Sequence, residues 1–208
     1  MIVYILKNEN LEALLPLMSE QRLEKINDIT ARGVREEKIC SYALLRYVIF
    51  MEYGFTEAPL FAYGEREKPY LKNYPFFFNL SHAGGYSACA VSDEEIGIDI
   101  QDFRPMRDSI SAKICTEKEL SIVYGGENPT PSETTCRLWC MKESYGKLTG
   151  KGFAQGFDKI ETSQLLESGR LKTTVTENGM YVSACGDQPL SEIELITVTA
   201  DDILSVLS

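Results

Sequence analysis

The sequence contains no long hydrophobic run, no secretory leader pattern and no pair of cysteines spaced for metal or redox chemistry. No stretch approaches the roughly 18 apolar residues that a membrane-spanning helix needs. The N-terminal run MIVYILKNEN is too short and lacks the basic residues that open a signal peptide. None of the six cysteines stands in a CxxC pair, and four lie in apolar or periodic segments. We therefore expect a cytoplasmic protein, without a membrane partner, whose cysteines are reduced structural thiols and not zinc ligands.

Positive charge and nucleotide-binding glycine motifs are also scarce. With 21 basic against 31 acidic residues the net charge is -10, which argues against a nucleic-acid partner, because a phosphate backbone binds clustered basic surfaces. Neither a GxxxxGK[ST] loop nor a GxGxxG turn occurs, so kinase and dehydrogenase classes have no support. An anionic ligand must then be held by local positive charge.

The sequence does contain a helix-and-strand pattern that occurs twice. Its 208 residues, 44% of them hydrophobic, are enough for one sizeable core or two small ones. Periodicity predicts a helix over residues 34–53, ended by Gly54, and a second over residues 136–149, ended by Gly150. The strands expected after them cover residues 76–80, 86–91, 96–100, 157–162, 171–176, 179–184 and 193–199.

This order predicts an α+β fold of two similar halves, residues 1–101 and 102–208, each with a long helix packed on a small antiparallel sheet. Residues 102–135 are expected to connect the halves, and a capping box at Thr116 predicts a short helix within them. Halves this small bury their sheets against helices and against each other. We expect a ligand in the cleft between them, and a monomer, because one chain can build that cleft.

Three short motifs carry candidate chemistry. In the strand at residues 96–101, alternation sends Ile96, Ile98 and Ile100 to one face and turns Asp99 and Gln101 toward the other. A plain alternative is a half-buried strand whose polar face is solvated.

The second motif lies on the helix at residues 136–149. Trp139, Glu143 and Lys147 recur at intervals of four residues and therefore share one face, which Lys142 flanks. A structural tryptophan beside a surface ion pair would give the same pattern.

The third motif, Phe78-Asn-Leu-Ser-His82, places the only histidine of the chain after an apolar strand. The Ser81 hydroxyl and the His82 imidazole can both donate to a phosphate. A lone histidine is also common as a capped turn residue.

Together, in this order, the motifs resemble the larger, Sfp-like class of 4'-phosphopantetheinyl transferases. The resemblance covers roughly residues 19–157. It rests on Lys68-Pro69, Asn79-Leu80-Ser81-His82, Gly97-Ile98-Asp99-Ile100, Trp139, Lys142-Glu143-Ser144 and Lys147.

The resemblance implies a magnesium-dependent enzyme that transfers 4'-phosphopantetheine from coenzyme A to a serine of an apo acyl, peptidyl or aryl carrier protein. It implies that Asp99 and Glu143, one from each half, bind Mg2+, a cation that prefers hard oxygen ligands. Glu143 is also the candidate base, and Lys147 is expected on the diphosphate. Gln101 stands where the family often has a third acid, so we expect it to ligate the metal as a neutral oxygen in a weaker site.

The resemblance also implies contacts for the nucleotide and the carrier. The expected contacts of coenzyme A are Ser81, His82, Lys68, Pro69, Arg22, Lys25, Lys38 and Lys142. Ala83 replaces a small hydroxyl residue and removes one phosphate donor. Residues 102–135 are expected to dock the carrier through apolar contacts that include Met106, Ile110 and Ile114.

Two alternative functions remain open at this stage. A non-catalytic module that binds coenzyme A or a carrier protein would keep the fold, and Gln101 gives it some support. A metal-dependent hydrolase of a nucleotide diphosphate would need a denser carboxylate cluster than the sequence shows.

Overall fold

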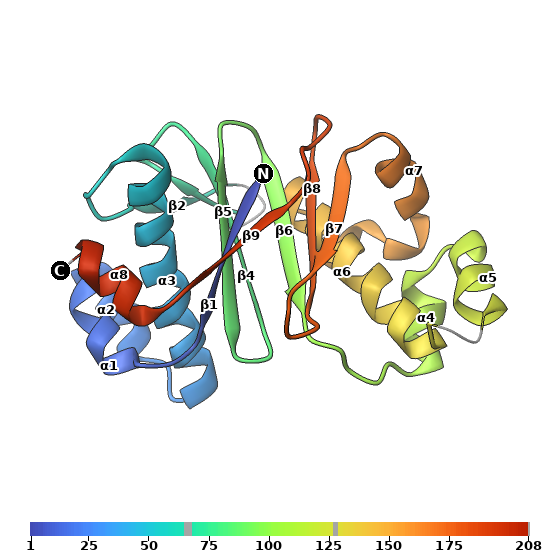
Figure 1. Ribbon diagram of the computed structural model, residues 1–208, viewed down its shortest axis with the longest axis horizontal. Coiled ribbons are helices and arrows are strands. Elements are labelled where there is room, and N and C mark those ends of the chain that lie inside the picture. The colour runs from blue at the N-terminus through green and yellow to red at the C-terminus, as the bar shows by residue number, and fades with distance from the viewer. Residues whose placement is uncertain (65–67, 127–128, 208) are drawn as a thin grey trace.

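Two small sheets lie face to face in the middle of the molecule, each with a long helix on its outer side (Figure 1). The computed structural model describes residues 1–64, 68–126 and 129–207. Helices occupy both ends of the long axis, so the layers run helix, sheet, sheet, helix. The predicted α+β class is confirmed.

The helices and strands follow one another along the chain in this order. Up to the strand that carries Asp99, its elements are β1 (Ile2–Lys7), α1 (Leu11–Leu14), the 3-10 turn η1 (Leu15–Leu17), α2 (Glu20–Asn27), α3 (Arg32–Tyr53), β2 (Phe61–Tyr63), β3 (Pro69–Leu71), β4 (Phe77–Ala83), β5 (Tyr86–Ser92) and β6 (Ile96–Gln101). The remaining elements are α4 (Asp108–Ile114), α5 (Glu117–Gly125), α6 (Pro131–Thr149), the 3-10 turns η2 (Gly152–Gln155) and η3 (Phe157–Lys159), α7 (Thr162–Glu167), β7 (Leu171–Val175), β8 (Tyr181–Gly186), β9 (Glu194–Val198) and α8 (Ala200–Leu207).

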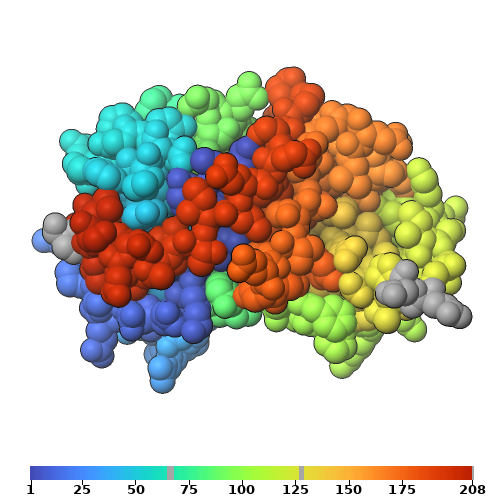
Figure 2. All heavy atoms as spheres, in the orientation of Figure 1, coloured from blue at the N-terminus to red at the C-terminus, as the bar shows by residue number. Residues whose placement is uncertain are grey.

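The first sheet has the strand order β4-β5-β1-β9 and joins the two ends of the chain. β1 pairs antiparallel with β5 but parallel with β9, with Ile2 opposite Glu194. Figure 2 shows the C-terminal segment, in red, crossing the face of the molecule from the second half to the first. The sheet is therefore mixed and not purely antiparallel, because its edge strand β9 comes from the far end of the chain and runs parallel to β1.

The second sheet has the order β6-β8-β7 and is antiparallel throughout. In it Ile96 lies opposite Gly186, and Gln101 lies opposite Tyr181. β6 thus belongs with α6, although it precedes the expected boundary at residue 101. The proposed division into residues 1–101 and 102–208 stays a prediction, and strand pairing crosses it in both directions, through β6 and through β9.

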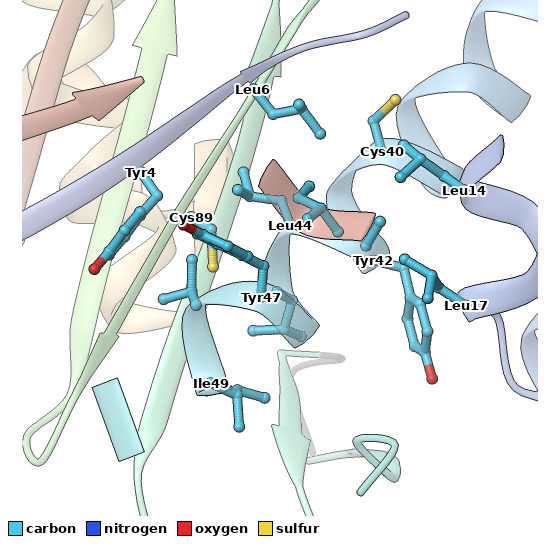
Figure 3. Packing of buried hydrophobic residues seen from close by; sticks show 14 of the residues in the cluster. Tyr4, Leu6, Leu14, Leu17, Cys40, Tyr42, Leu44, Tyr47, Ile49 and Cys89 are labelled. Atoms are coloured by element: carbon cyan, nitrogen blue, oxygen red, sulfur yellow. The ribbon is translucent and has the colours of Figure 1, made fainter. Parts of the chain in front are cut away.

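Both long helices form where the periodicity predicts them. α3 is buried over its middle turns against β1 and β5, where Leu44 and Tyr47 meet Tyr4, Leu6 and Cys89 (Figure 3). Gly54 ends the helix with a φ of 73°, a left-handed conformation that favours glycine.

α6 begins a turn earlier than predicted. The side chain of Thr130 accepts a hydrogen bond from the Glu133 amide, and Pro131 occupies the first turn, where its missing N–H costs nothing. Gly150 ends the helix with a φ of 67°.

Two local expectations have different outcomes. The capping box at Thr116 is present, with reciprocal bonds to Glu119, and opens α5. The strand expected over residues 157–162 is wrong, because these residues form η3 and the start of α7. All six cysteine side chains are buried. Across the described residues, no helix is both long and apolar enough to span a bilayer.

Candidate active site

The alternation expected in β6 is confirmed and sets the position of Asp99. Ile96, Ile98 and Ile100 lie in the apolar core between the two sheets. Gly97 and Asp99 point to the opposite face, against α6. A β-carbon on Gly97 would collide with the backbone of Ser144 and Leu148, so glycine lets the strand and the helix approach closely.

The carboxylate of Asp99 lies at the centre of a buried polar cluster. Its Oδ1 accepts a hydrogen bond from Lys147 Nζ at 2.7 Å and another from Ser81 Oγ at 2.8 Å. Asp99 is only 6% exposed, so its charge is desolvated and needs this cation. Its other oxygen, Oδ2, is buried and has no hydrogen-bond partner within the described part of the chain.

Glu143 supplies a second carboxylate to the same face. It lies on α6 one turn before Lys147, as the spacing predicts. Burial raises the pKa of Glu143, and the negative charge of Asp99 raises it further, while Lys147 opposes both effects. Glu143 and Asp99 therefore repel each other across a partly desolvated space.

Asp99 and Glu143 lie on opposite sides of the proposed boundary at residue 101, but their elements pack together in space. β6 pairs with β8 and packs on α6, so Asp99 and Glu143 both come from the second sheet and its helix. The first sheet contributes Ser81 and His82 from β4, which lies beside β6.

Gln101 is buried at the end of β6. Its amide Nε2 donates to the backbone oxygen and to Oδ1 of Asp102, at 3.0 Å each. This leaves the amide oxygen as the atom that can bind a cation. Two carboxylates and one amide are thus the candidate donors, and no group of three or more histidine, cysteine and acidic side chains suited to a metal is found among the described residues.

His82 lies on β4 beside charges of both signs. Its Nδ1 is 3.3 Å from Glu37 Oε2 on α3. Burial lowers the pKa of His82 most, the charges of Lys38 and Lys147 lower it further, and Glu37 and Asp99 oppose them. The structure therefore brings His82, Lys38 and Lys147 together and adds Glu37, which no sequence motif indicated.

Arg22 and Lys25, both on α2, lie on aromatic rings. The guanidinium of Arg22 is 5.5 Å from the ring centroids of Tyr42 and Phe61, and its Nε is buried without a hydrogen-bond partner among the described residues. Lys25 Nζ is 5.4 Å from the ring of Tyr63. Their contact with a phosphate stays a prediction.

Lys68 and Pro69 line a hollow between β4 and the end of α6. Lys68 Nζ donates to the Leu148 carbonyl at 2.9 Å, at the end of α6, and also pairs with Glu95. A hollow of about 270 Å³ opens beside Lys147, and a larger one of about 770 Å³ adjoins it, sharing Lys68 and Pro69. Lys68 therefore links the halves at the edge of the space where a nucleotide is expected.

Lys142 does not join the other expected contacts. Its side chain is fully buried, 2.6 Å from Glu119, and donates to the carbonyls of Phe157 at 2.7 Å and Ile160 at 2.6 Å. Neighbouring residues on a helix point about 100° apart, so Lys142 cannot share the face of Glu143. We correct its assignment from a ligand contact to an internal ion pair.

The apolar residues expected to dock a carrier also point inward. Ile114 is fully buried, and Met106 and Ile110 are half-buried and pack against buried clusters, so little of these side chains is left for a partner. Docking on residues 102–135 stays a prediction, and residues 127–128 of that range lie outside the described structure. The exposed large apolar side chains of the described residues in this region are Phe103, Ile122 and Tyr124.

The fold is thus α+β, and its candidate site combines two carboxylates with lysine side chains. A family model for the 4'-phosphopantetheinyl transferase superfamily matches residues 95–188, the range that contains Asp99, Glu143 and Lys147. Over that range the chain is similar to this superfamily, and its similarity extends to Sfp-like members over most of its length.

Curated relatives match over most of the chain. The chain is 24% identical to the 4'-phosphopantetheinyl transferase Sfp of Bacillus subtilis (strain 168) over 214 residues, covering 96% of this chain and 95% of the relative. It is 27% identical to the 4'-phosphopantetheinyl transferase psf-1 of Bacillus pumilus over 180 residues, covering 79% of this chain and 77% of the relative. It is also 30% identical to AcpT of Escherichia coli (strain K12), over 56% of this chain and 58% of the relative.

Proposed function

We propose that this protein transfers the 4'-phosphopantetheine group from coenzyme A to a serine of an apo acyl, peptidyl or aryl carrier protein and releases 3',5'-ADP. The observation that carries the proposal is the desolvated Asp99 carboxylate beside Lys147 and Glu143, with one oxygen that has no partner among the described residues. This arrangement lies in the range that the superfamily model matches.

The donor set fits Mg2+. Asp99 Oδ2 is a buried oxygen with no partner among the described residues, and Glu143 is disfavoured as a free anion, so both gain from a hard cation. Asp99 and Glu143 would hold the metal, with the Gln101 amide oxygen as a third ligand. When bound, the metal would neutralise charge on the diphosphate.

Lys147 and Glu143 would serve the transfer itself. The serine oxygen of the carrier bonds to the phosphorus that bears the pantetheine arm, and the bond from that phosphorus to the oxygen of the leaving 3',5'-ADP breaks. Glu143 would accept the serine proton. Lys147 stabilises the negative charge that develops on the diphosphate.

The remaining expectations belong to the same proposal. His82, Lys68, Pro69, Arg22, Lys25 and Lys38 are proposed around the nucleotide, and Ser81 lies at the edge of this group with its hydroxyl bonded to Asp99 and Lys147. We expect the carrier to dock on residues 102–135 through exposed apolar side chains such as Phe103, and the enzyme to act as a cytoplasmic monomer. Transfer that falls steeply as salt is raised would contradict an apolar interface.

The test is to incubate the protein with coenzyme A, Mg2+ and an apo carrier protein and then to weigh the carrier. A mass gain of one phosphopantetheine, absent for Asp99→Ala and Glu143→Ala, is the expected result. Ser87→Ala is a matched control, because Ser87 is buried in β5 and bonded to Ser41 and Asn8, outside the cleft. Coenzyme A binding with no mass gain on acyl, peptidyl and aryl carriers would instead support a non-catalytic binding module.

A further inference from the structure

β6 is the outer strand of its sheet, and within the described part of the chain β8 is its one strand partner. Its pairing with β8 leaves the amides of Ile98 and Ile100 directed toward β4. β4 lies alongside but belongs to the other sheet, so no backbone ladder joins the two strands. Buried amides of this kind need acceptors from elsewhere.

Two side chains of β4 supply those acceptors. Asn79 Oδ1 accepts from the Ile98 amide at 2.9 Å, and Ser81 Oγ accepts from the Ile100 amide at 3.1 Å. Asn79 and Ser81 are two residues apart, so both point the same way from β4 and match the two-residue step of β6. Their oxygens replace the carbonyls of a missing strand and fix the register of β4 against β6.

Ser81 also connects this register to the candidate site. Its hydroxyl donates to Asp99 Oδ1 at 2.8 Å and accepts from Lys147 Nζ at 2.7 Å, in addition to the Ile100 amide. A hydroxyl has one proton and two lone pairs, so its bonding capacity is full. Ser81 is 3% exposed and has nothing left to offer a phosphate in this arrangement.

We propose that Asn79 and Ser81 are positioning residues, which lock β4 onto β6 and hold the Asp99 carboxylate with Oδ2 free for a cation. The consequence for catalysis rests on the proposed function, whereas the lock itself does not. This role replaces direct recognition of the 3'-phosphate by the Ser81 hydroxyl. Loss of a partner that orients a metal-binding side chain commonly lowers metal affinity about 10-fold to 100-fold.

Hydrogen exchange at single amides tests the lock without any substrate. In Ser81→Ala the Ile100 amide should exchange at least about tenfold faster, and in Asn79→Ala the Ile98 amide should do so. Each variant should leave the other amide less affected. Ser87→Ala, which loses a buried hydroxyl away from β6, should alter neither amide.

Substrate kinetics then separate the two roles of Ser81. With Ser81→Ala, the Mg2+ concentration for half-maximal rate should rise about tenfold, equally for coenzyme A and for dephospho-coenzyme A, which lacks the 3'-phosphate. Ser81→Thr, which keeps the hydroxyl, should restore most of the loss. A phosphate contact predicts instead a higher KM for coenzyme A alone.

Two results would contradict the proposal. Unchanged exchange at Ile98 and Ile100 in the alanine variants would overturn the lock, and a defect confined to coenzyme A would overturn the positioning role of Ser81. If Ser81→Ala does not fold, Asn79→Asp and Asn79→Ala offer the same comparison, because aspartate keeps an oxygen acceptor for Ile98. If no transfer occurs with any variant, the proposed function fails while the exchange result still decides the lock.

Discussion

Lys147 Nζ lies 2.7 Å from Asp99 Oδ1 and joins the last turn of α6 to the middle of β6. A cation at this end of the helix is favoured by the helix dipole, and its side chain is 27% exposed while that of Asp99 is 8% exposed. The pair therefore has a buried, fixed anion and a cation that can still reach the cleft. Glu143, one turn earlier on α6, shares this surface.

Replacing Glu143 by glutamine should stabilise the metal-free protein at neutral pH. Burial and Asp99 raise the pKa of Glu143 above its ordinary value of 4.5, so the native state holds its proton longer than the unfolded chain. The free energy of unfolding then falls as the pH rises through this window, and Glu143→Gln removes the fall. Chemical unfolding in EDTA should give Glu143→Gln a higher free energy of unfolding than the parent protein at pH 7. Below pH 4 the two free energies should be equal.

Glu12 is exposed, and Glu12→Gln is the matched control. It should leave the free energy of unfolding unchanged at both pH values. A metal-free Glu143→Gln protein that is less stable than the parent at pH 7 would contradict the prediction.

Replacing Gln101 by glutamate should tighten the binding of Mg2+. The side chain is buried at the end of β6, beside Asp102, and a third carboxylate adds the negative charge that the site lacks. We expect roughly tenfold tighter Mg2+ binding and, without metal, a less stable protein, because anions gather in a desolvated space. Mg2+ titration by calorimetry measures the first and thermal unfolding in EDTA the second. Affinity that is unchanged in Gln101→Glu but lost in Gln101→Ala would show the amide to be a fully adequate ligand.

Replacing Lys142 by methionine should destabilise the fold without weakening the binding of coenzyme A. Removal of one partner leaves the Glu119 carboxylate buried, which costs about 3–5 kcal/mol in comparable buried pairs. Denaturant unfolding measures the loss, and the exposed Lys118→Met serves as the control. A raised KM for coenzyme A with unchanged stability would show instead that Lys142 contacts the ligand.

Replacing Gly97 by alanine should be far more damaging than the same change at Gly33. A β-carbon at Gly97 meets the backbone of α6, which cannot move aside as a side chain can, so we expect a loss of about 3 kcal/mol or more. A β-carbon at Gly33, in the first turn of α3, meets nothing within 4 Å and should stabilise by about 0.4–1 kcal/mol. Equal unfolding midpoints for the two variants would contradict the close approach of β6 and α6.

Local rules predicted much of this protein. The caps at Gly54 and Gly150 and the box at Thr116 follow from the preferences of single turns, and alternation in β6 correctly assigned Ile98 to the core and Asp99 to the other face. The helical spacing of Glu143 and Lys147 likewise needs no tertiary information. The strand predicted over residues 157–162 is wrong because Phe157 and Ile160, the two apolar residues of this segment, are three residues apart, a spacing that suits a helical turn, and both pack in the same cluster.

The sequence by itself determined the α+β class, the two long helices and the motifs that carry the family resemblance. Only the tertiary structure decided that β6 packs on α6, that β9 pairs with β1, and that Lys142 pairs with Glu119. The physical reason is that strand pairing and buried ion pairs join residues far apart in the chain, and their choice depends on which buried groups would otherwise lack a partner. The side chains of Asn79 and Ser81 act as acceptors for β6 for the same reason, since β4 lies beside the amides of Ile98 and Ile100 but forms no backbone ladder with them in the described structure.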